Sequence, residues 1–323
     1  MKTIWKDMIT ALLMGMVLPG IVLNLAVMLL DVRGQVPQVT VPLETREEAA
    51  AHTMYLRGGD GRLTQMDLEL YLTGVVLAEM PASFEEEALK AQAVAASTYT
   101  RKAWESGGKH ADGSVCTDPG CCQAYLTEER YLEKGGTQEG IQKIRNAVHA
   151  TAGEVLTYEG ELIEATYFSC SGGSTEDAVA VWGTDYPYLQ AVPSPGEENA
   201  EGFTDSVRFS VKEFQEKVGI ALSGKPEEWF GPVAYTEGGG VETMTIGGKQ
   251  YSGTYLRSAL GLRSTAFSVA EADQMEIVLV TRGYGHRVGM SQYGADAMAA
   301  AGSDYRQILA HYYPGTAVSQ IQG

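Results

Sequence analysis

The stretch that decides the fold reads LAEMPASFEEEALKAQAVAASTYTRKAW and covers residues 77–104. Pro81 disfavours a helical conformation for the residue before it, so a preceding helix should end at about Glu79. Working back from that end, Thr64 is a suitable cap for a helix that begins near Gln65. The sequence therefore predicts one helix over residues 65–79.

A second helix follows directly. Ser83 and Glu86 match an S-x-x-E capping box, and the three glutamates of residues 85–87 suit the positive end of a helix. The run from Ala88 to Trp104 is rich in alanine, which has the highest helix propensity. We therefore expect a long helix that continues to about Trp104.

The rest of the chain mixes strand and helix signals. Residues 153–158, 163–169 and 276–282 are typical of short strands. Ser291 can cap a helix that runs to Ala301, and residues 303–313 predict one more helix. Together these elements predict an α+β domain, in which the helical part from about residue 64 to 106 packs on mixed strands and leaves a substrate groove.

The N-terminal region has the composition of a membrane anchor. Residues 8–30 carry no charge, and at about 1.5 Å per residue they can cross a bilayer core of roughly 30 Å. Lys2 and Lys6 precede this stretch and favour a cytoplasmic N-terminus. We expect a short cytoplasmic segment (1–7), a transmembrane helix (8–30), a linker (31–51) and an extracytoplasmic domain (52–323). A cleaved signal peptide is the alternative.

The overall charge argues against one class of function. The formal net charge is -17, and the lysines and arginines form no cluster along the sequence. A surface that binds phosphate backbones needs such a cluster, so nucleic acid is not an expected partner.

Glu79 is the candidate catalytic group. Its neighbours Leu77, Ala78 and Met80 are apolar, and it lies at a predicted helix C-terminus. Both the apolar surroundings and the negative end of the helix should raise its pKa. A carboxyl group that stays protonated near neutral pH can act as a general acid. The alternative is an exposed glutamate at a helix end.

Two short motifs near the C-terminus fail to match common sites. Gly283 and Gly285 are followed by Gly289, one residue too late for the G-x-G-x-x-G dinucleotide motif. Ser291 also misses the G-x-S-x-G elbow, because Gly294 lies three residues on. Substrate-binding or structural roles are the expectation for His286, Gln292 and Tyr293.

Several segments of the chain resemble the stage II sporulation protein D family. The similar segments are 71–81 (YLTGVVLAEMP), 87–96 (EALKAQAVAA), 167–175 (YFSCSGGST), 282–295 (RGYGHRVGMSQYGA) and 312–315 (YYPG). They occur in the order found in the family and span about residues 65–315. The chain departs from the family at Ser97, where arginine is usual, and at Arg287, where glycine is usual.

The resemblance implies a peptidoglycan lytic transglycosylase with Glu79 as its catalytic acid. Such an enzyme cleaves the bond between N-acetylmuramic acid and N-acetylglucosamine and leaves 1,6-anhydro ends. The attacking group is the substrate's own 6-hydroxyl, so one carboxyl group suffices where ordinary glycosidases need two. The implied substrate-binding residues are Gln92, Tyr167, Ser169, Ser171, Thr175, His286, Gln292 and Tyr293.

The resemblance also implies a biological setting. The family acts between the mother-cell and forespore membranes during engulfment in endospore formation. Its substrate is glycan strands whose stem peptides an amidase has removed. The implied partners are that amidase, stage II sporulation protein P, and the membrane protein stage II sporulation protein M.

The cysteines form a second candidate site. His110, Cys116 and Cys122 are spaced six residues apart in a loop rich in glycine and proline, and such a loop can place three ligands around zinc. Some members of the family similar to this chain bind zinc through one His and two Cys at this spacing. We expect a mainly structural zinc ion, with Cys121 as a bystander or an alternative ligand. A disulfide or free thiols are the alternatives.

Two other classes of function are compatible with the sequence. One is a zinc-dependent cell-wall amidase that uses His110, Cys116 and Cys122 for catalysis. The other is a non-catalytic glycan-binding scaffold, an option that Ser97 and Arg287 keep open.

Overall fold

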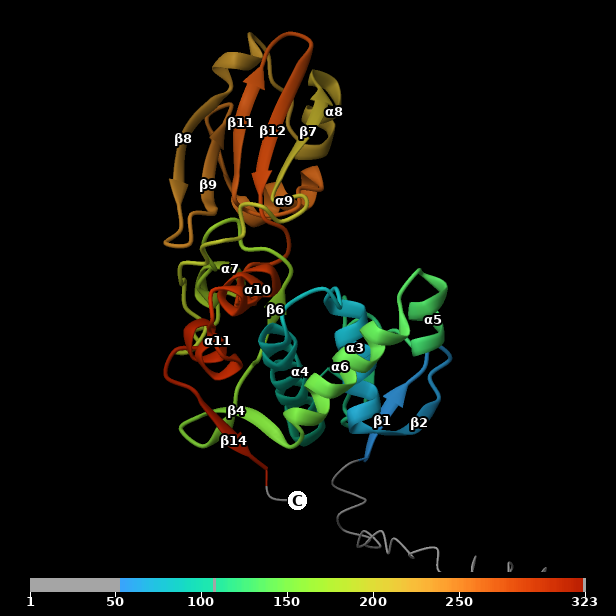
Figure 1. Cartoon of the computed structure of the whole chain (residues 1–323). Helices are drawn as coiled ribbons and strands as arrows, with labels where there is room; N and C mark the ends of the chain where they lie inside the picture. Colours follow the sequence, from blue (N-terminus) through green and yellow to red (C-terminus); the bar gives the residue numbers. More distant parts are fainter. Residues whose placement is uncertain (1–52, 107–108, 322–323) are drawn as a thin grey trace, which may run out of the picture. The chain divides into compact units, whose positions relative to one another are not determined.

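The computed structural model describes residues 53–106 and 109–321, and the predicted anchor (8–30) and linker (31–51) lie outside them. Within the described ranges, no helix is long and apolar enough to cross a membrane. The described residues form one compact unit of the α+β class, with helices and several small sheets (Figure 1).

The helices of the unit range from one and a half turns to almost six turns. They are α3 (Leu68–Glu79), α4 (Glu86–Ser106), α5 (Glu128–Glu133), α6 (Gln138–Ala150), α7 (Ala178–Trp182), α8 (Val211–Val218), α9 (Gly253–Leu260), α10 (Gln292–Ala300) and α11 (Tyr305–Tyr312), with a short 3₁₀ turn at Pro226–Glu228.

The strands form small sheets, mostly of three strands. One has the order β2 (Leu63–Asp67), β1 (Thr53–Arg57), β3 (Val115–Cys116), and another the order β14 (Ala317–Gln320), β4 (Glu154–Tyr158), β5 (Glu161–Leu162). A third has the order β11 (Phe267–Ala272), β12 (Glu276–Arg282), β7 (Thr204–Ser210), and a fourth the order β10 (Lys249–Ser252), β9 (Val241–Ile246), β8 (Phe230–Tyr235). A parallel pair joins β6 (Tyr167–Phe168) to β13 (Met290–Ser291).

Two hydrophobic cores divide the unit. The first core surrounds α4, whose alanine-rich faces contact α3, α6, α10, α11 and β4. The second core lies within residues 204–282, which we call the second lobe, and is built around Phe209, Phe214 and Trp229. The first core draws side chains from both sides of this lobe in the sequence, including Leu156 before it and Leu309 after it.

The main predicted elements are confirmed, and some of their boundaries are wrong. The strand predicted at residues 276–282 and the helix capped by Ser291 are present. Thr64 does not start a helix. It lies in β2, opposite Leu56 of β1, and the cap of α3 is Asp67, whose side chain accepts a hydrogen bond from the Leu70 backbone.

The capping box predicted at Ser83 is also wrong, because α4 begins three residues later at Glu86. The backbone N–H of Glu85 donates instead to Asp296 Oδ1 over 2.7 Å. The start of this helix is therefore held by α10 from the other end of the chain.

Candidate active site

Glu79 lies at the wall of a cavity of about 760 Å³. As predicted, it is the last residue of α3, and the following residue Met80 is extended before Pro81. The cavity is also lined by residues of α4, the loop 119–123, strand β6, α7 and the segment 285–286. Segments distant in the sequence therefore meet around this one carboxyl group.

Two hydrogen bonds fix the Glu79 carboxyl group. The backbone N–H of Ala124 donates to Oε1 over 3.2 Å, and the side-chain amide of Gln292 donates to Oε2 over 3.1 Å. Burial raises the pKa of Glu79, and the hydrogen bonds from Gln292 and Ala124 offset part of that rise. The raised pKa that the sequence predicted is therefore present, with burial as its main cause.

Gln92 and Gln292 form a pair of buried amides behind this carboxyl group. Gln292 is buried at the start of α10, and its amide nitrogen also lies 3.5 Å from Gln92 Oε1. Gln92 is fully buried on α4, and its own amide nitrogen has no hydrogen-bond partner among the described residues. Gln292 therefore acts on Glu79 from the interior, Gln92 contacts Gln292, and neither glutamine lines the cavity.

Tyr167 and Ser169 line the cavity, as a substrate-binding role requires. The Tyr167 hydroxyl donates to Gln123 Oε1 over 2.8 Å, while the Gln123 amide donates to Tyr71 and Thr100. Burial, and after it the charge of Glu79, raise the pKa of Tyr167 well above its usual value, so its phenol stays protonated. Gln123 belongs to this site although no sequence motif points to it.

His286 also lines the cavity, and its ring packs against two aromatic rings. The ring centroids of Phe168 and Trp182 lie 5.5 and 5.4 Å from it. Burial lowers the pKa of His286 to about 4, so the imidazole is neutral near pH 7. Its Nδ1 accepts a hydrogen bond from the Val288 backbone over 3.2 Å.

Ser171, Thr175 and Tyr293 lie outside the cavity lining. The Ser171 hydroxyl donates to Glu197, and the Thr175 hydroxyl donates to the Gln190 carbonyl. The Tyr293 ring packs edge-on against Phe84, with 5.0 Å between centroids. In the structure these three side chains make internal contacts that shape the loops behind the cavity.

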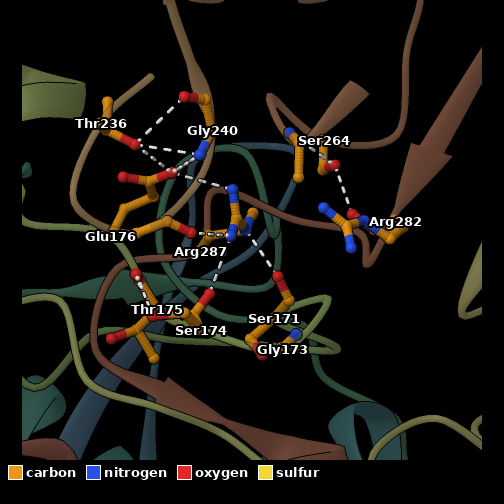
Figure 2. A network of polar contacts seen from close by, with 12 residues as sticks. Ser171, Gly173, Ser174, Thr175, Glu176, Thr236, Gly240, Ser264, Arg282 and Arg287 are labelled. Atoms are coloured by element: carbon orange, nitrogen blue, oxygen red, sulfur yellow. Dashed lines mark hydrogen bonds and ion pairs between the residues drawn. The ribbon is translucent and has the colours of Figure 1, made fainter. Parts of the chain in front are cut away.

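Arg287 explains much of that loop shape (Figure 2). Its φ of 67° is in the left-handed region that glycine adopts most readily. The buried guanidinium forms a 2.8 Å ion pair with Glu176 and donates to the carbonyls of Ser171 and Ser174. It also donates to the carbonyl of Gly238 in the second lobe. The arginine thus fills the space behind a turn at which the resemblance implies glycine.

His110, Cys116, Cys121 and Cys122 form a cluster that can hold a metal ion. Their ligand atoms all lie within 4.8 Å of one another, and all three cysteines are free. Cys121, which the sequence left as a bystander or an alternative ligand, is the fourth member. The cluster lies beside the cavity, because Pro119, Gly120 and Cys122 also line it.

The donor set suits zinc, and two of its spacings lie close to those of a tetrahedral site. A tetrahedron with bonds of about 2.0–2.3 Å has edges of roughly 3.3–3.8 Å. The Cys121 sulfur lies 3.6 Å from His110 Nε2 and 3.9 Å from the Cys122 sulfur. Although burial raises it, hydrogen bonds from His110 and the Asp118 backbone lower the pKa of Cys116 to about 7.

Comparison with known proteins places the chain in a class of sporulation proteins. A family model described as "Stage II sporulation protein" matches residues 57–158, which include Glu79 and the metal-binding cluster. The chain is 38% identical to stage II sporulation protein D of Bacillus amyloliquefaciens over 281 residues, 85% of this chain and 81% of that protein. It is 37% identical to stage II sporulation protein D of Bacillus subtilis (strain 168), over 86% of this chain and 81% of that protein.

The chain therefore belongs to the stage II sporulation protein D family. It is also 30% identical to a protein named amidase enhancer from Bacillus subtilis, over 77% of this chain and 40% of that longer protein. These relatives place the chain among sporulation and cell-wall proteins.

Proposed function

We propose that the protein is a lytic transglycosylase that cleaves peptidoglycan glycan strands, with Glu79 as its catalytic acid. The observation that carries this proposal is the position of Glu79, a carboxyl group of raised pKa at the wall of a cavity. A buried carboxyl group kept protonated near neutral pH is suited to donate a proton to a leaving oxygen.

One carboxyl group completes the reaction. Glu79 donates its proton to the glycosidic oxygen as the bond from that oxygen to the muramic acid anomeric carbon breaks. The 6-hydroxyl of the same muramic acid then bonds to the anomeric carbon, and its proton passes to the Glu79 carboxylate. The product is a 1,6-anhydro end, Glu79 regains its proton, and water is not consumed.

The neighbouring polar groups support this role. The Ala124 N–H and the Gln292 amide hold both carboxyl oxygens in place, and they stabilise the carboxylate that forms after proton donation. The other acidic residue of the cavity lining, Glu164, is paired with Lys102 at 3.2 Å. We therefore assign no acid or base role to Glu164.

Zinc is the proposed occupant of the cluster of His110, Cys116, Cys121 and Cys122. A bound zinc ion would stabilise the thiolates and tie the loop 110–122 to one geometry. If all four residues bound the ion, no coordination position would be open, which supports a structural role and weighs against the zinc-dependent amidase alternative.

Family membership supports the proposed setting. We place the domain outside the cytoplasm, between the mother-cell and forespore membranes, with residues 8–30 as the anchor. The proposed substrate is amidase-stripped glycan, and the proposed partners are stage II sporulation proteins P and M. The support for these assignments is the similarity to stage II sporulation protein D of two Bacillus species.

The test is product analysis by mass spectrometry on purified, amidase-stripped strands. We expect wild type to give 1,6-anhydro ends, which are lighter than reducing ends by one water. Glu79→Gln should lose activity by at least about a hundredfold, since a general acid contributes 10²–10⁴-fold. Glu164→Gln, the matched control in the same cavity, should still give anhydro ends.

Two results would overturn the proposal. Reducing ends that disappear in Glu164→Gln would indicate a hydrolase with two carboxyl groups. Glycan binding without any cleavage by wild type would favour the non-catalytic scaffold.

A further inference from the structure

Trp182 is exposed although it lies in the wall of the cavity. It is the last residue of α7, and Gly183, with a φ of 74°, ends the helix directly after it. The residue is 42% exposed, and this exposed indole belongs to the lining of the cavity that also contains Glu79. Neither the proposed reaction nor the internal packing of the protein accounts for this exposure.

The indole ring is supported from within the protein. His286 packs against it with 5.4 Å between ring centroids, and Phe168 packs against His286 in turn. His286 is a neutral ring near pH 7, as described above. These ring contacts hold the Trp182 side chain in place. A ligand that binds to it therefore causes only a small loss of side-chain entropy.

The wall between Trp182 and Glu79 is continuous. Ala124, whose N–H donates to Glu79, follows Gln123, which accepts a hydrogen bond from Tyr167. Tyr167 is followed by Phe168, whose ring contacts His286. Glu79, Gln123, Tyr167, Phe168, His286 and Trp182 all line the same cavity, so a ligand that fills the cavity contacts both Glu79 and the indole of Trp182.

We infer that Trp182 is a sugar-stacking platform that binds an N-acetylated pyranose of the glycan strand at a distance from the cleaved bond. This inference rests on the proposed function. The C–H groups on one face of a pyranose ring match the electron-rich face of an indole. The same lining contains polar side chains, among them the Lys102–Glu164 pair and Thr166, which suit the hydroxyl and acetamido groups at the ring edge.

The test measures binding separately from cleavage. The full chain carrying Glu79→Gln, in mild detergent, is titrated with chitotetraose, a neutral oligomer of N-acetylglucosamine, by calorimetry. Trp182→Ala in this background should bind roughly tenfold more weakly, and Trp182→Phe should keep most of the affinity. The matched control is Val179→Ala, on the same helix, 50% exposed and outside the cavity lining, which should bind normally.

A second readout uses the intact enzyme on stripped strands. Trp182→Ala should raise KM with little change in kcat, because a remote platform binds substrate and transition state equally. Equal affinity of Trp182→Ala and Val179→Ala for chitotetraose, or no binding to the Glu79→Gln chain, would overturn the inference. Trp182-dependent binding without cleavage by wild type would keep the platform and refute the transglycosylase.

Discussion

The Glu79 carboxyl group combines a structural cost with a chemical use. Burial raises its pKa because a charged carboxylate is poorly solvated at the end of α3. The same protonated form that burial favours is the form that can donate a proton to a leaving group. Stability and proposed activity therefore depend on one titration.

The sign of that dependence can be tested. Because the folded pKa lies above the unfolded value of 4.5, the stability that protonated Glu79 contributes is fully present below about pH 4.5 and is lost as pH rises through the folded pKa. Each factor of ten between the two acid constants corresponds to about 1.4 kcal/mol. Glu79→Gln should therefore melt at a higher temperature than wild type above the folded pKa, with the difference shrinking on acidification. The measurement is the melting temperature of both proteins between pH 4 and 8.

The prediction would be contradicted if the difference in melting temperature between wild type and Glu79→Gln stayed constant from pH 4 to 8. Asp296→Asn is an informative comparison, because the pKa of this half-buried carboxyl group is also raised by burial and it lies outside the cavity lining. It should show the same sign of pH dependence without loss of glycan cleavage.

Among single residues, the sequence predicted the catalytic candidate Glu79 better than it predicted the residues that surround it. Pro81 and the apolar neighbours pointed to Glu79 because they act on it locally. Gln123, Ala124 and Trp182 were missed, since they reach the site only through tertiary contacts of ordinary residue types. Gln292 was named as a substrate-binding or structural residue, and in the structure its amide donates to Glu79.

Among the elements, the loop 110–122 carries the cluster that could bind a metal ion, and this loop also contributes to the cavity wall. Its cluster lies next to residues that line the cavity, so the loop geometry affects the substrate wall. Without a cation, burial and the neighbouring cysteines raise the pKa of Cys122 to about 12. Three crowded thiols are a poor structural element unless a cation or a disulfide joins them.

Removal of the proposed zinc ion should loosen the loop 110–122. We expect about one zinc per chain by plasma mass spectrometry, and chelation should lower the melting temperature because zinc binds only the folded cluster. Cys116→Ser and Cys121→Ser should each reduce the zinc content. The control is Cys170→Ser, a buried cysteine that hydrogen-bonds Glu197 away from the cluster, which should keep its zinc. Full zinc content in Cys121→Ser would return Cys121 to the role of a bystander.

The element boundaries show where local signals fail. Thr64 is a good helix cap in isolation, but pairing of β2 with β1 extends the strand to Asp67, which becomes the cap instead. Ser83 does not cap α4. Instead, Asp296 accepts a hydrogen bond from the Glu85 backbone at the start of this helix. By contrast, Ser291 and the strand 276–282 were predicted correctly because their signals agree with their packing.

On the scale of the whole molecule, the Arg287–Glu176 pair connects the two lobes. Glu176 Oε1 also accepts hydrogen bonds from Thr236 and from the Gly240 backbone, both in the second lobe (Figure 2). Both charged side chains are 1% exposed. This pair therefore links the turn behind the cavity to residues 236–240.

Breaking the Arg287–Glu176 pair should weaken the contact between the turn behind the cavity and residues 236–240. Arg287→Met leaves Glu176 buried without its cation, which should cost about 3–5 kcal/mol in urea unfolding. Amide hydrogen exchange should rise first at residues 171–176 and 236–240. The control is Arg208→Ala, which removes an exposed ion pair with Glu276 in the second lobe. It should lower the free energy of unfolding by less than about 1 kcal/mol. Equal stability of Arg287→Met and wild type would contradict the prediction.

The division of the first core across the second lobe has a consequence for synthesis. Glu79 and its amide partner Gln292 are separated by 213 positions in the chain, and Leu309 and Tyr312 complete the packing around α4 later still. A nascent or prematurely ended chain thus contains the acid without the groups that bury and orient it. If the proposed glycan cleavage is correct, this order of assembly leaves the site incomplete until α10 and α11 have been synthesised.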